Sequence, residues 1–283
     1  MRTTPTSFGG DRSSPVATAS ALAQAAHPGP AVVVTAVTAM LAVASRLAPA
    51  AAVTVTAAVF AGQLTIGWGN DLRDADRDAL VGRGDKPLAS GRLSPRLVRS
   101  VLGLAAVACV LLSAAVGWRS ATVHLGLGVA SGHAYNLWLK ATAFSWVPYA
   151  VAFGALPAVV SLAGAAHDGP AAYVVLAAAC LGVGAHLLNA LPDLADDART
   201  GVLGLPHRLG EQRSRMTAAL LLGSASLLSI LGPQRPVQTP SVAALVGAAV
   251  LVLCTLRGRG RAPFVAAMLL ALLDVLLLAA ATR

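Results

Sequence analysis

The chain has 283 residues, of which 56% are hydrophobic and only 12% are charged, and its net charge is +9. About a quarter of the residues are charged in an ordinary soluble domain, so this composition excludes a typical soluble enzyme and indicates an all-α integral membrane protein. The positive charge does not indicate a nucleic-acid partner, because aromatic residues make up only 4% of the chain and the basic residues flank apolar segments.

The chain begins with a polar stretch and continues with apolar segments. Residues 1–26 are rich in Ser, Thr and Ala and lack a compact apolar core, so we expect a short disordered tail rather than a signal peptide. A membrane domain at 27–283 follows it. A membrane-spanning helix needs about 20 apolar residues, and segments of roughly this length predict nine transmembrane helices: 29–47, 50–68, 97–117, 120–138, 145–165, 171–190, 215–232, 240–256 and 262–281.

The loops between these segments differ in charge. With nine spans, the loops after the second, fourth, sixth and eighth spans lie on the same side as the N-terminus, and this side holds seventeen of the 21 Lys and Arg residues. Cytoplasmic loops of membrane proteins carry an excess of Lys and Arg. We therefore expect the N-terminus and these loops to lie in the cytoplasm and the C-terminus to lie outside.

The most charged stretch, 70–94, follows the second apolar segment and contains five of the twelve acidic residues. Asn70, Asp74 and Asp78 are spaced four residues apart, which places them along one face of a helix. Asp71 falls beside this stripe. A charged island between membrane-length segments is costly unless it faces water or takes part in chemistry.

A second copy of this spacing follows the sixth apolar segment. Asn189, Asp193 and Asp197 repeat the pattern N-x-x-x-D-x-x-x-D, and on a helix they form a second stripe. Both copies are followed by glycine and by basic residues, which are Arg83 and Lys86 in the first copy and His207 and Arg208 in the second. The repeat indicates an internal duplication in which two Asp-bearing helix ends face each other across a cavity.

Facing carboxylates of this kind are suited to binding a diphosphate through Mg²⁺. Mg²⁺ prefers carboxylate and phosphate oxygens, and nearby basic residues stabilise the charge that develops on a leaving group. A solvated linker is the main alternative for either motif alone, and the duplication argues against it. An EF-hand calcium loop is a second alternative, but Ala79 stands where that motif requires Gly and Asp85 stands where it requires Glu.

Taken together, the motifs resemble the UbiA superfamily of intramembrane prenyltransferases. The resemblance rests on NDLRDADRD at 70–78, KPLASGRLS at 86–94, AYNLWLK at 134–140, NALPDLADDARTG at 189–201 and RLG at 208–210. Their order and spacing, together with the nine-span plan, match the family from about residue 27 to the last residue.

The resemblance implies nine helices around a central cavity, with the Asp motifs at its cytoplasmic mouth. It implies that one group of Mg²⁺ ions is held by Asn70, Asp71, Asp74 and Asp78 and another by Asp193 and Asp197. The expected catalytic residues are Asp74, Asp78, Asp193, Asp197 and Lys140. The expected substrate-binding residues are Asn70, Asp71, Arg83, Lys86, Tyr135, Asn189 and Arg208.

Tyr135 and Lys140 match the family's Tyr/Lys element after the fourth span, but some members have one residue fewer between them. Five residues turn a regular helix by about 500°, so the two side chains would not share a face on a regular helix. A lysine at the membrane edge and an aromatic residue at the interface are the alternative interpretations of these two residues.

Several other polar residues have no fixed role in the sequence. His27 stands where many members carry Arg-Pro, and it either lines the mouth of the site or caps the first helix. His133 and His186 lie within apolar segments, where a histidine is a functional hypothesis by default. Asp274 lies in the last segment without an obvious partner.

The function implied by the resemblance is Mg²⁺-dependent ionisation of an isoprenyl diphosphate to an allylic cation. An acceptor, typically an aromatic ring, captures this cation, while the isoprenyl tail lies between apolar helices that open towards membrane lipid. One alternative is a terpene cyclase of the same superfamily, which needs no acceptor. A second alternative is a non-enzymatic membrane transporter or binding protein.

Overall fold

The structure, a computed structural model, describes residues 14–164, 169–233 and 239–281. These residues form helices joined by loops and contain no strand. In chain order the helices are α1 (Pro15–Ala25), α2 (Pro28–Ala44), α3 (Pro49–Leu80), α4 (Pro95–Val116), α5 (Trp118–Val123), the π-helix η1 (His124–Val129), α6 (Ala130–Ala134), the π-helix η2 (Tyr135–Leu139), α7 (Val147–Ser161), α8 (Ala172–Asn189), the 3₁₀-helix η3 (Leu191–Asp193), α9 (Leu194–Arg199), α10 (Leu205–Leu209), α11 (Glu211–Leu231), α12 (Thr239–Arg257) and α13 (Ala262–Ala281).

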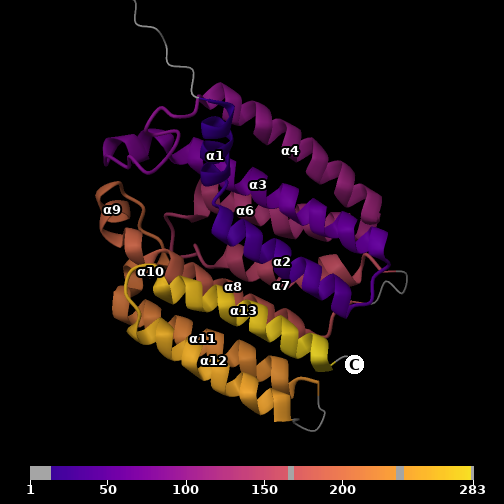
Figure 1. Ribbon diagram of the computed structural model, residues 1–283. Coiled ribbons are helices and arrows are strands. Elements are labelled where there is room, and N and C mark those ends of the chain that lie inside the picture. The colour runs from indigo at the N-terminus through magenta and orange to yellow at the C-terminus, as the bar shows by residue number, and fades with distance from the viewer. Residues whose placement is uncertain (1–13, 165–168, 234–238, 282–283) are drawn as a thin grey trace, which may run out of the picture.

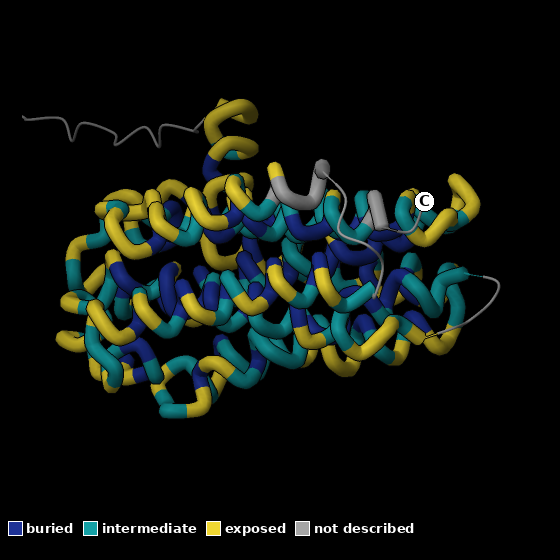
Figure 2. Tube along the Cα trace, turned by 90° about the horizontal axis from the view of Figure 1, so that it is seen from below, coloured by how far each residue is buried: buried dark blue, intermediate teal, exposed yellow. Residues whose placement is uncertain are grey.

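The long helices lie side by side, with α4 along one edge of the bundle and α11 and α12 along the opposite edge (Figure 1). The short helices α9 and α10 and the loop after α3 lie together at one end of the bundle. Figure 2 shows that buried residues lie mainly between the helices and that exposed residues lie mainly on their outer sides.

Each predicted apolar segment overlaps helical structure, and the fourth corresponds to α5, η1, α6 and η2, which follow one another without a break. Four described helices are long and apolar enough to cross a membrane, or five if the bent pair α1 and α2 is one span. Three other apolar helical stretches, Val147–Ser161, Leu245–Arg257 and Ala262–Leu278, have only 10–17 residues. The structure confirms an all-helical fold of apolar helices but does not confirm the count of nine spans.

Proline residues begin several of these helices. The first residues of α2, α3 and α4 are Pro28, Pro49 and Pro95, at a position where the missing N–H would have no helical partner. The side chain of Ser94 also caps α4, because its Oγ accepts a hydrogen bond from the N–H of Leu97 at 3.2 Å.

The helix α1 lies within the segment predicted to be disordered. Residues 1–13 lie outside the described residues, but Pro15–Ala25 form a helix. Trp68 of α3 donates a hydrogen bond from its indole N–H to the carbonyl oxygen of Leu22 at 2.9 Å. The prediction of disorder is therefore wrong for α1, because its small alanine side chains pack against α3 and α4 in a common apolar cluster.

Three clusters of buried apolar side chains join the helices. The first includes Leu187, Leu222 and Leu270 and joins α8, α11, α12 and α13. The second includes Trp68 and joins α1, α3 and α4. The third includes Val160 and joins α2, α3, α7 and α13. The burial of these side chains fixes the helices that bear the polar motifs.

A sharp turn between α1 and α2 lies against α3. The two helices are bent by 70° relative to each other, and His27 at the turn has a left-handed backbone with φ of 54°. A Cβ atom on Gly67 of α3 would lie 2.4 Å from the carbonyl oxygen of Ala26. Only glycine allows this approach, which brings His27 next to the polar part of α3.

Candidate active site

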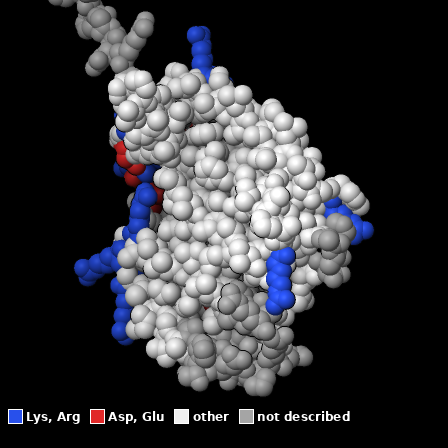
Figure 3. Space-filling view, turned by 45° about the vertical axis from the view of Figure 1, so that its right-hand side comes forward, with Lys and Arg blue, Asp and Glu red and all other residues white. Residues whose placement is uncertain are grey.

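The two polar motifs lie at one end of the helical bundle. We call Asn70–Ser94 the first wall and Asn189–Gly210 the second wall. Nη1 of Arg83 in the first wall donates a hydrogen bond to Oδ1 of Asp193 in the second wall at 3.1 Å. Figure 3 shows acidic side chains gathered in one place beside basic side chains, on a face that is otherwise mostly uncharged. The hydrogen bond between Arg83 and Asp193 thus joins the two motifs at this end of the bundle.

The first wall begins on α3, which continues as a regular helix beyond its apolar part. Asn70, Asp74 and Asp78 lie along one face of this helix, as predicted. The exposed fractions are only 2% for Asp71, 6% for Asp74 and 7% for Asp78, whereas Asp76 is exposed. The carboxyl groups of the motif thus point into the structure.

The carboxyl group of Asp71 meets two basic side chains. Nζ of Lys86 donates to Oδ1 of Asp71 at 2.8 Å, and Nε2 of His27 lies 3.0 Å from the same oxygen. Oδ2 of Asp71 is buried without a hydrogen-bond partner among the described residues. Although His27 occupies the N-cap position of α2, its side chain makes no capping hydrogen bond. Of the two interpretations of His27, the structure favours a residue that lines the site.

The carboxyl group of Asp74 likewise meets two basic side chains. Nζ of Lys140 donates to Oδ2 of Asp74, and the guanidinium group of Arg77, one turn further along α3, lies 2.8 Å from the same oxygen. The side chain of Lys140 is only 16% exposed. The structure thus brings Lys140 into the site rather than leaving it at the edge of the membrane.

The loop after α3 holds Arg83 between the two walls. Besides its bond to Asp193, Arg83 donates to both carboxyl oxygens of Asp85, at 3.0 and 3.2 Å. The hydrogen bond to Asp85 and the nearby charge of Asp193 raise the pKa of Arg83, and the bond from Arg83 lowers the pKa of Asp85. Leu88 and Leu93 bury the remainder of the loop in the cluster around α1, α3 and α4.

The second wall differs from the predicted stripe. The helix α8 ends at Asn189, a 3₁₀ turn follows, and α9 begins only at Leu194. Pro192 explains the interruption, since it has no N–H to donate to the carbonyl of Leu188 and its ring crowds that carbonyl. The expectation that Asn189, Asp193 and Asp197 continue one regular helix is therefore wrong.

The side chains of the second wall are less enclosed than those of the first. Asp193 and Asp197 are half-buried, and both Asn189 and Arg208 are exposed. Nε2 of His207 lies 4.0 Å from Oδ2 of Asp197, and the side chain of His207 is only 8% exposed. From α10, therefore, His207 rather than its neighbour Arg208 lies against the second motif. In the sequence, a role for His207 in the site was indicated only by its position in a basic stretch flanked by glycine residues.

The helix around Tyr135 and Lys140 is not a regular α-helix. Tyr135–Leu139 form a π-helix, in which the N–H of Lys140 donates to the carbonyl of Tyr135 at 3.0 Å. Residues five apart lie roughly one above the other in such a turn. The π-helix therefore accommodates the extra residue between Tyr135 and Lys140 and removes the objection that these two residues cannot share a face.

An aromatic cluster adjoins the site. The ring of Tyr135 meets Tyr149 edge-on at 5.1 Å and His186 edge-on at 5.6 Å, and Tyr149 stacks on His186 at 4.5 Å. Ser145 Oγ lies 3.0 Å from Nε2 of His186 and accepts the N–H of Leu205 at 2.9 Å. Tyr149 and Ser145 carried no motif in the sequence, so their part in this cluster appears only in the structure.

His133 lies apart from this cluster. Its Nε2 lies 3.3 Å from Oγ1 of Thr65, and its ring approaches Gly69 closely enough that a Cβ atom there would lie 3.3 Å from it. These contacts describe a residue that joins α6 to α3 rather than one that faces the carboxylates.

Three carboxylates of the two walls, those of Asp71, Asp74 and Asp193, are paired with basic groups. Within the described part of the chain, no three Asp, Glu, His or Cys side chains converge closely enough to surround a metal ion. Lys86, Lys140, Arg77 and Arg83 each form an ion pair with a motif carboxylate. The site is thus rich in oxygen donors whose charge is balanced by the chain itself.

Comparisons with known proteins agree with this architecture. The model of the UbiA prenyltransferase family matches residues 31–280. Digeranylgeranylglyceryl phosphate synthase of Methanopyrus kandleri is 33% identical over 186 residues, which are 63% of this chain and 63% of that protein. The bacteriochlorophyll synthase 33 kDa chain of Cereibacter sphaeroides is 31% identical over 186 residues, which are 61% of this chain and 60% of that protein. The matched region thus spans less than two thirds of each of these relatives.

A solved structure shares the fold. A UbiA homologue from Archaeoglobus fulgidus, bound to GPP and Mg²⁺, superposes with a TM-score of 0.68 and 15% identity over 93% of this chain and 99% of that chain. At this identity the likeness establishes the common fold.

Proposed function

Because the chain belongs to the UbiA prenyltransferase family, we propose that it transfers an isoprenyl group from an isoprenyl diphosphate to an acceptor within the membrane, in a Mg²⁺-dependent reaction. The names of the two relatives and the ligands of the Archaeoglobus homologue support this reaction class. The observation that carries the proposal is the meeting of the two Asp-bearing walls, joined by Arg83 and Asp193, at one end of an apolar bundle.

The side chains of the two walls are of the kind that binds Mg²⁺, which needs only one or two protein carboxylates when phosphates and waters supply the other ligands. They offer carboxylate and amide oxygens, which are the ligands that Mg²⁺ prefers, and the buried Oδ2 of Asp71 has no hydrogen-bond partner among the described residues. When bound, Mg²⁺ neutralises the charge that develops on a departing diphosphate. We assign one group of ligands to Asn70, Asp71, Asp74 and Asp78 and the other to Asp193 and Asp197.

Two basic residues of the first wall, together with Lys140 at the end of η2, would hold the diphosphate oxygens. Arg83, Lys86 and Lys140 already lie within hydrogen-bond distance of the motif carboxylates, so they need little movement to reach an anion bound beside those carboxylates. Charge-assisted bonds from such groups stabilise a leaving diphosphate as the bond to carbon breaks. Asn189 and Arg208 are exposed at the same end of the bundle. We assign to them contacts with the diphosphate from the solvent side.

The aromatic cluster favours an aromatic acceptor. Tyr135, Tyr149 and His186 present rings in edge-on and stacked arrangements, and another ring packs well against such a group. The same rings exclude water, which would otherwise capture an allylic cation. The isoprenyl tail would lie further along the apolar helices, next to membrane lipid.

The proposed membrane arrangement follows the charge of the loops. Nine helices within residues 27–283 would cross the membrane, with the N-terminal residues 1–26 and both walls in the cytoplasm and the C-terminus outside. This topology is supported by the seventeen Lys and Arg residues assigned to one side.

The purified protein should be incubated with geranyl, farnesyl or geranylgeranyl diphosphate and a panel of aromatic acceptors, in Mg²⁺ or in excess chelator. Mass spectrometry of lipid products and measurement of released diphosphate should show Mg²⁺-dependent release together with a prenylated acceptor. A hydrocarbon or alcohol formed without any acceptor would favour the cyclase alternative. Absence of diphosphate release with every substrate would contradict the proposal and favour a binding or transport protein.

A further inference from the structure

The second wall contains a buried histidine that makes no hydrogen bond through its ring to the described residues. His207 lies on α10, and its side chain is only 8% exposed. Both ring nitrogens, Nδ1 and Nε2, are buried without a hydrogen-bond partner in the described part of the chain. Buried polar atoms without partners are costly and uncommon in folded proteins. The ring is therefore placed to bind a further group.

This environment distinguishes His207 from the other described histidines. Each of those has a ring nitrogen within hydrogen-bond distance of a polar side chain, and they are His27, His124, His133 and His186. His27 also lies beside motif carboxylates, but its Nε2 is already in contact with both Asp71 and Lys86. Of the histidines that the structure describes, His207 is thus the one whose nitrogens both remain available.

Nε2 of His207 faces a carboxylate that has no Lys or Arg partner. It lies 4.0 Å from Oδ2 of Asp197, which is half-buried. Asp193, one turn earlier, pairs with Arg83, whereas no described Lys or Arg lies within ion-pair distance of Asp197. The separation of 4.0 Å is too long for a hydrogen bond. One metal ion can contact both atoms, because each metal–ligand bond is about 2 Å long.

Asp197 faces the place assigned to the diphosphate. Lys140 and Arg77 both interact electrostatically with Asp197, and the same two side chains pair with Asp74 of the first wall. No three described Asp, Glu, His or Cys side chains surround a single ion. An ion between Asp197 and His207 therefore takes its further ligands from diphosphate oxygens and water, and in this respect the inference rests on the proposed function.

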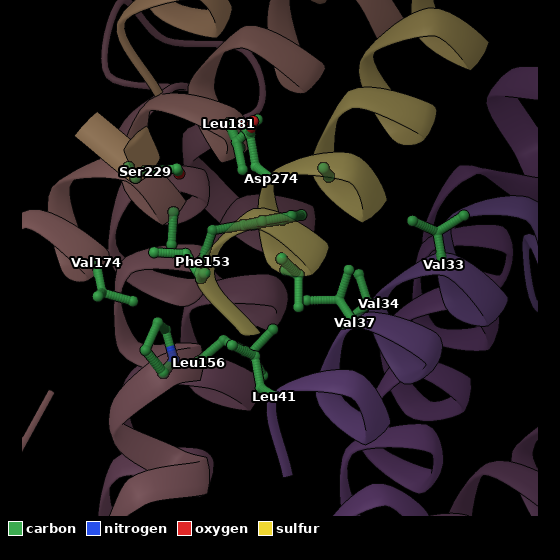
Figure 4. A pocket seen from close by; sticks show the side chains of 16 residues that line it. Val33, Val34, Val37, Leu41, Phe153, Leu156, Val174, Leu181, Ser229 and Asp274 are labelled. Atoms are coloured by element: carbon green, nitrogen blue, oxygen red, sulfur yellow. The ribbon is translucent and has the colours of Figure 1, made fainter. Parts of the chain in front are cut away.

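Burial of an acid alone does not create such a site. Asp274 is 1% exposed and lines a small pocket among valine and leucine side chains (Figure 4). Among the described residues, the lining of this pocket includes no histidine, no basic residue and no second acid. The pair of Asp197 and His207 differs from this pocket because it combines an oxygen donor with a nitrogen donor.

We propose that Asp197 and His207 form a mixed oxygen–nitrogen site that binds a divalent first-row transition-metal ion more tightly than Mg²⁺ when a diphosphate is present. Imidazole nitrogen is a good ligand for transition metals, whereas Mg²⁺ prefers oxygen ligands and retains its waters. The residues assigned to the Mg²⁺ group of the first wall all offer oxygen atoms. The two walls thus differ in the ion that suits them.

Pulsed electron paramagnetic resonance of Mn²⁺ tests the proposal on the full chain in nanodiscs. The thiolodiphosphate analogue of geranyl diphosphate, in which sulfur replaces the bridging oxygen, supplies the phosphate ligands without reacting. Mn²⁺ is the weakest binder of the transition-metal series, so it is a stringent probe. We expect a nitrogen coupling in the spin-echo spectrum, because an imidazole nitrogen is bound directly to the ion. Mg²⁺ should abolish this coupling only at about tenfold excess over Mn²⁺.

Two histidine variants identify the bound nitrogen. His207→Gln keeps a polar side chain but removes the imidazole, so the nitrogen coupling should disappear while Mn²⁺ still binds at the first wall. His27→Asn is the matched control, because His27 lies against Asp71 in the first wall, and it should leave the coupling unchanged. Persistence of the coupling in His207→Gln, or its loss in His27→Asn, would overturn the proposal.

The wild-type chain alone can also overturn the proposal, so the test does not depend on the folding of a variant. Mn²⁺ that binds without a nitrogen coupling, or a coupling that disappears at equal concentrations of Mg²⁺ and Mn²⁺, would overturn it. Either result would leave prenyl transfer intact, because the oxygen ligands of the walls can still hold Mg²⁺. Failure of both ions to bind together with the analogue would contradict the metal–diphosphate site and overturn both proposals.

Discussion

The two walls contain the same motif but are built differently. The first wall continues a regular helix, and the carboxyl groups of Asp71, Asp74 and Asp78 are buried. In the second wall the helix is interrupted, and Asp193 and Asp197 are only half-buried. Sequence repetition therefore does not imply repeated geometry, because a single proline is enough to end the helix in one copy.

The two walls also differ in how they are held. Leu88 and Leu93 anchor the first wall in the apolar cluster, and the side chain of Gln24 donates to the carbonyl of Asp85 at 2.8 Å. The second wall is joined to the first through Arg83 and Asp193. A segment with more exposed residues and fewer buried contacts opens more readily. We therefore expect the first wall to be preorganised and the second to adjust when substrate binds.

Loss of a motif carboxylate in either wall should have the largest effect. Asp74→Asn and Asp193→Asn keep the size of the side chain but remove a charge that the proposed Mg²⁺ site requires. We expect each to lower Mg²⁺-dependent diphosphate release by about 10²–10³-fold. Steady-state rates of diphosphate release measure this.

Matched controls for these variants lie close by in the chain. Asp76 is exposed on the same helix as Asp74, and Asp196 pairs with the exposed Arg199 at 2.7 Å. Asp76→Asn and Asp196→Asn should retain near wild-type rates. A loss as large as that of the motif variants would show that overall acidity, rather than the two stripes, determines the rate.

The interruption in the second wall is tested by Pro192→Ala. Alanine supplies an N–H for the carbonyl of Leu188, so α8 can continue and turn Asp193 away from Arg83. A misplacement of about 1 Å can cost about 10²-fold in rate. We therefore expect the rate of diphosphate release to fall by about 10- to 100-fold. Helix content, measured by circular dichroism, should rise. Pro95→Ala, at the first position of α4, is the control and should change neither quantity. An unchanged rate in Pro192→Ala would mean that the walls tolerate either geometry.

The close approach of the α1–α2 turn to the first wall is tested by Gly67→Ala. The new Cβ would lie 2.4 Å from the carbonyl oxygen of Ala26, so the turn must move or the helices must separate. We expect a loss of about 1–3 kcal/mol in the free energy of unfolding, measured by denaturant or thermal unfolding in detergent. At Gly103 of α4 a Cβ meets nothing within 4 Å, so Gly103→Ala should stabilise the helix slightly. Equal effects of the two substitutions would contradict the described packing.

The smallest effect concerns the pair of Arg83 and Asp85. The bond from Arg83 lowers the pKa of Asp85 below 3.8, so the pair stabilises the folded state at neutral pH and this contribution is lost as the pH falls through the lowered value. Because the side chain of Asp85 is 55% exposed, the contribution should stay below about 1 kcal/mol. Unfolding temperatures of the wild type and Asp85→Asn should differ slightly at neutral pH and converge in acid. A difference that grows in acid would contradict this sign.

The sequence predicted the all-helical fold because this fold depends on composition, and the four-residue spacing predicted the stripe on α3. Long apolar segments predict helices, and polar residues four positions apart predict a stripe along one face of a helix. The stripe on α3 follows this rule. The interruption at Pro192 was also readable in principle, since proline inside a helix removes a hydrogen bond. The expectation of a regular second stripe was based on residue spacing alone and did not consider the hydrogen bond that Pro192 cannot form.

Other features could not be read from the sequence. The π-helix at Tyr135–Leu139 depends on packing of this segment against neighbouring helices, which no local pattern encodes. The helix α1 has a weakly polar composition, and it is ordered by contacts with Trp68 that are distant in sequence. The deep burial of Asp274, which is 1% exposed, likewise became visible only in the structure.

Lys86 and Lys140 act as counter-ions that the chain itself supplies to Asp71 and Asp74. A metal ion bound at Oδ1 of Asp71 or at Oδ2 of Asp74 would displace the ammonium group that contacts this oxygen. Each displaced ammonium group stays tethered beside the carboxylate and is free to pair with an anion. Entry of a cation and of a phosphate-bearing anion should therefore be mutually reinforcing, as linked equilibria require.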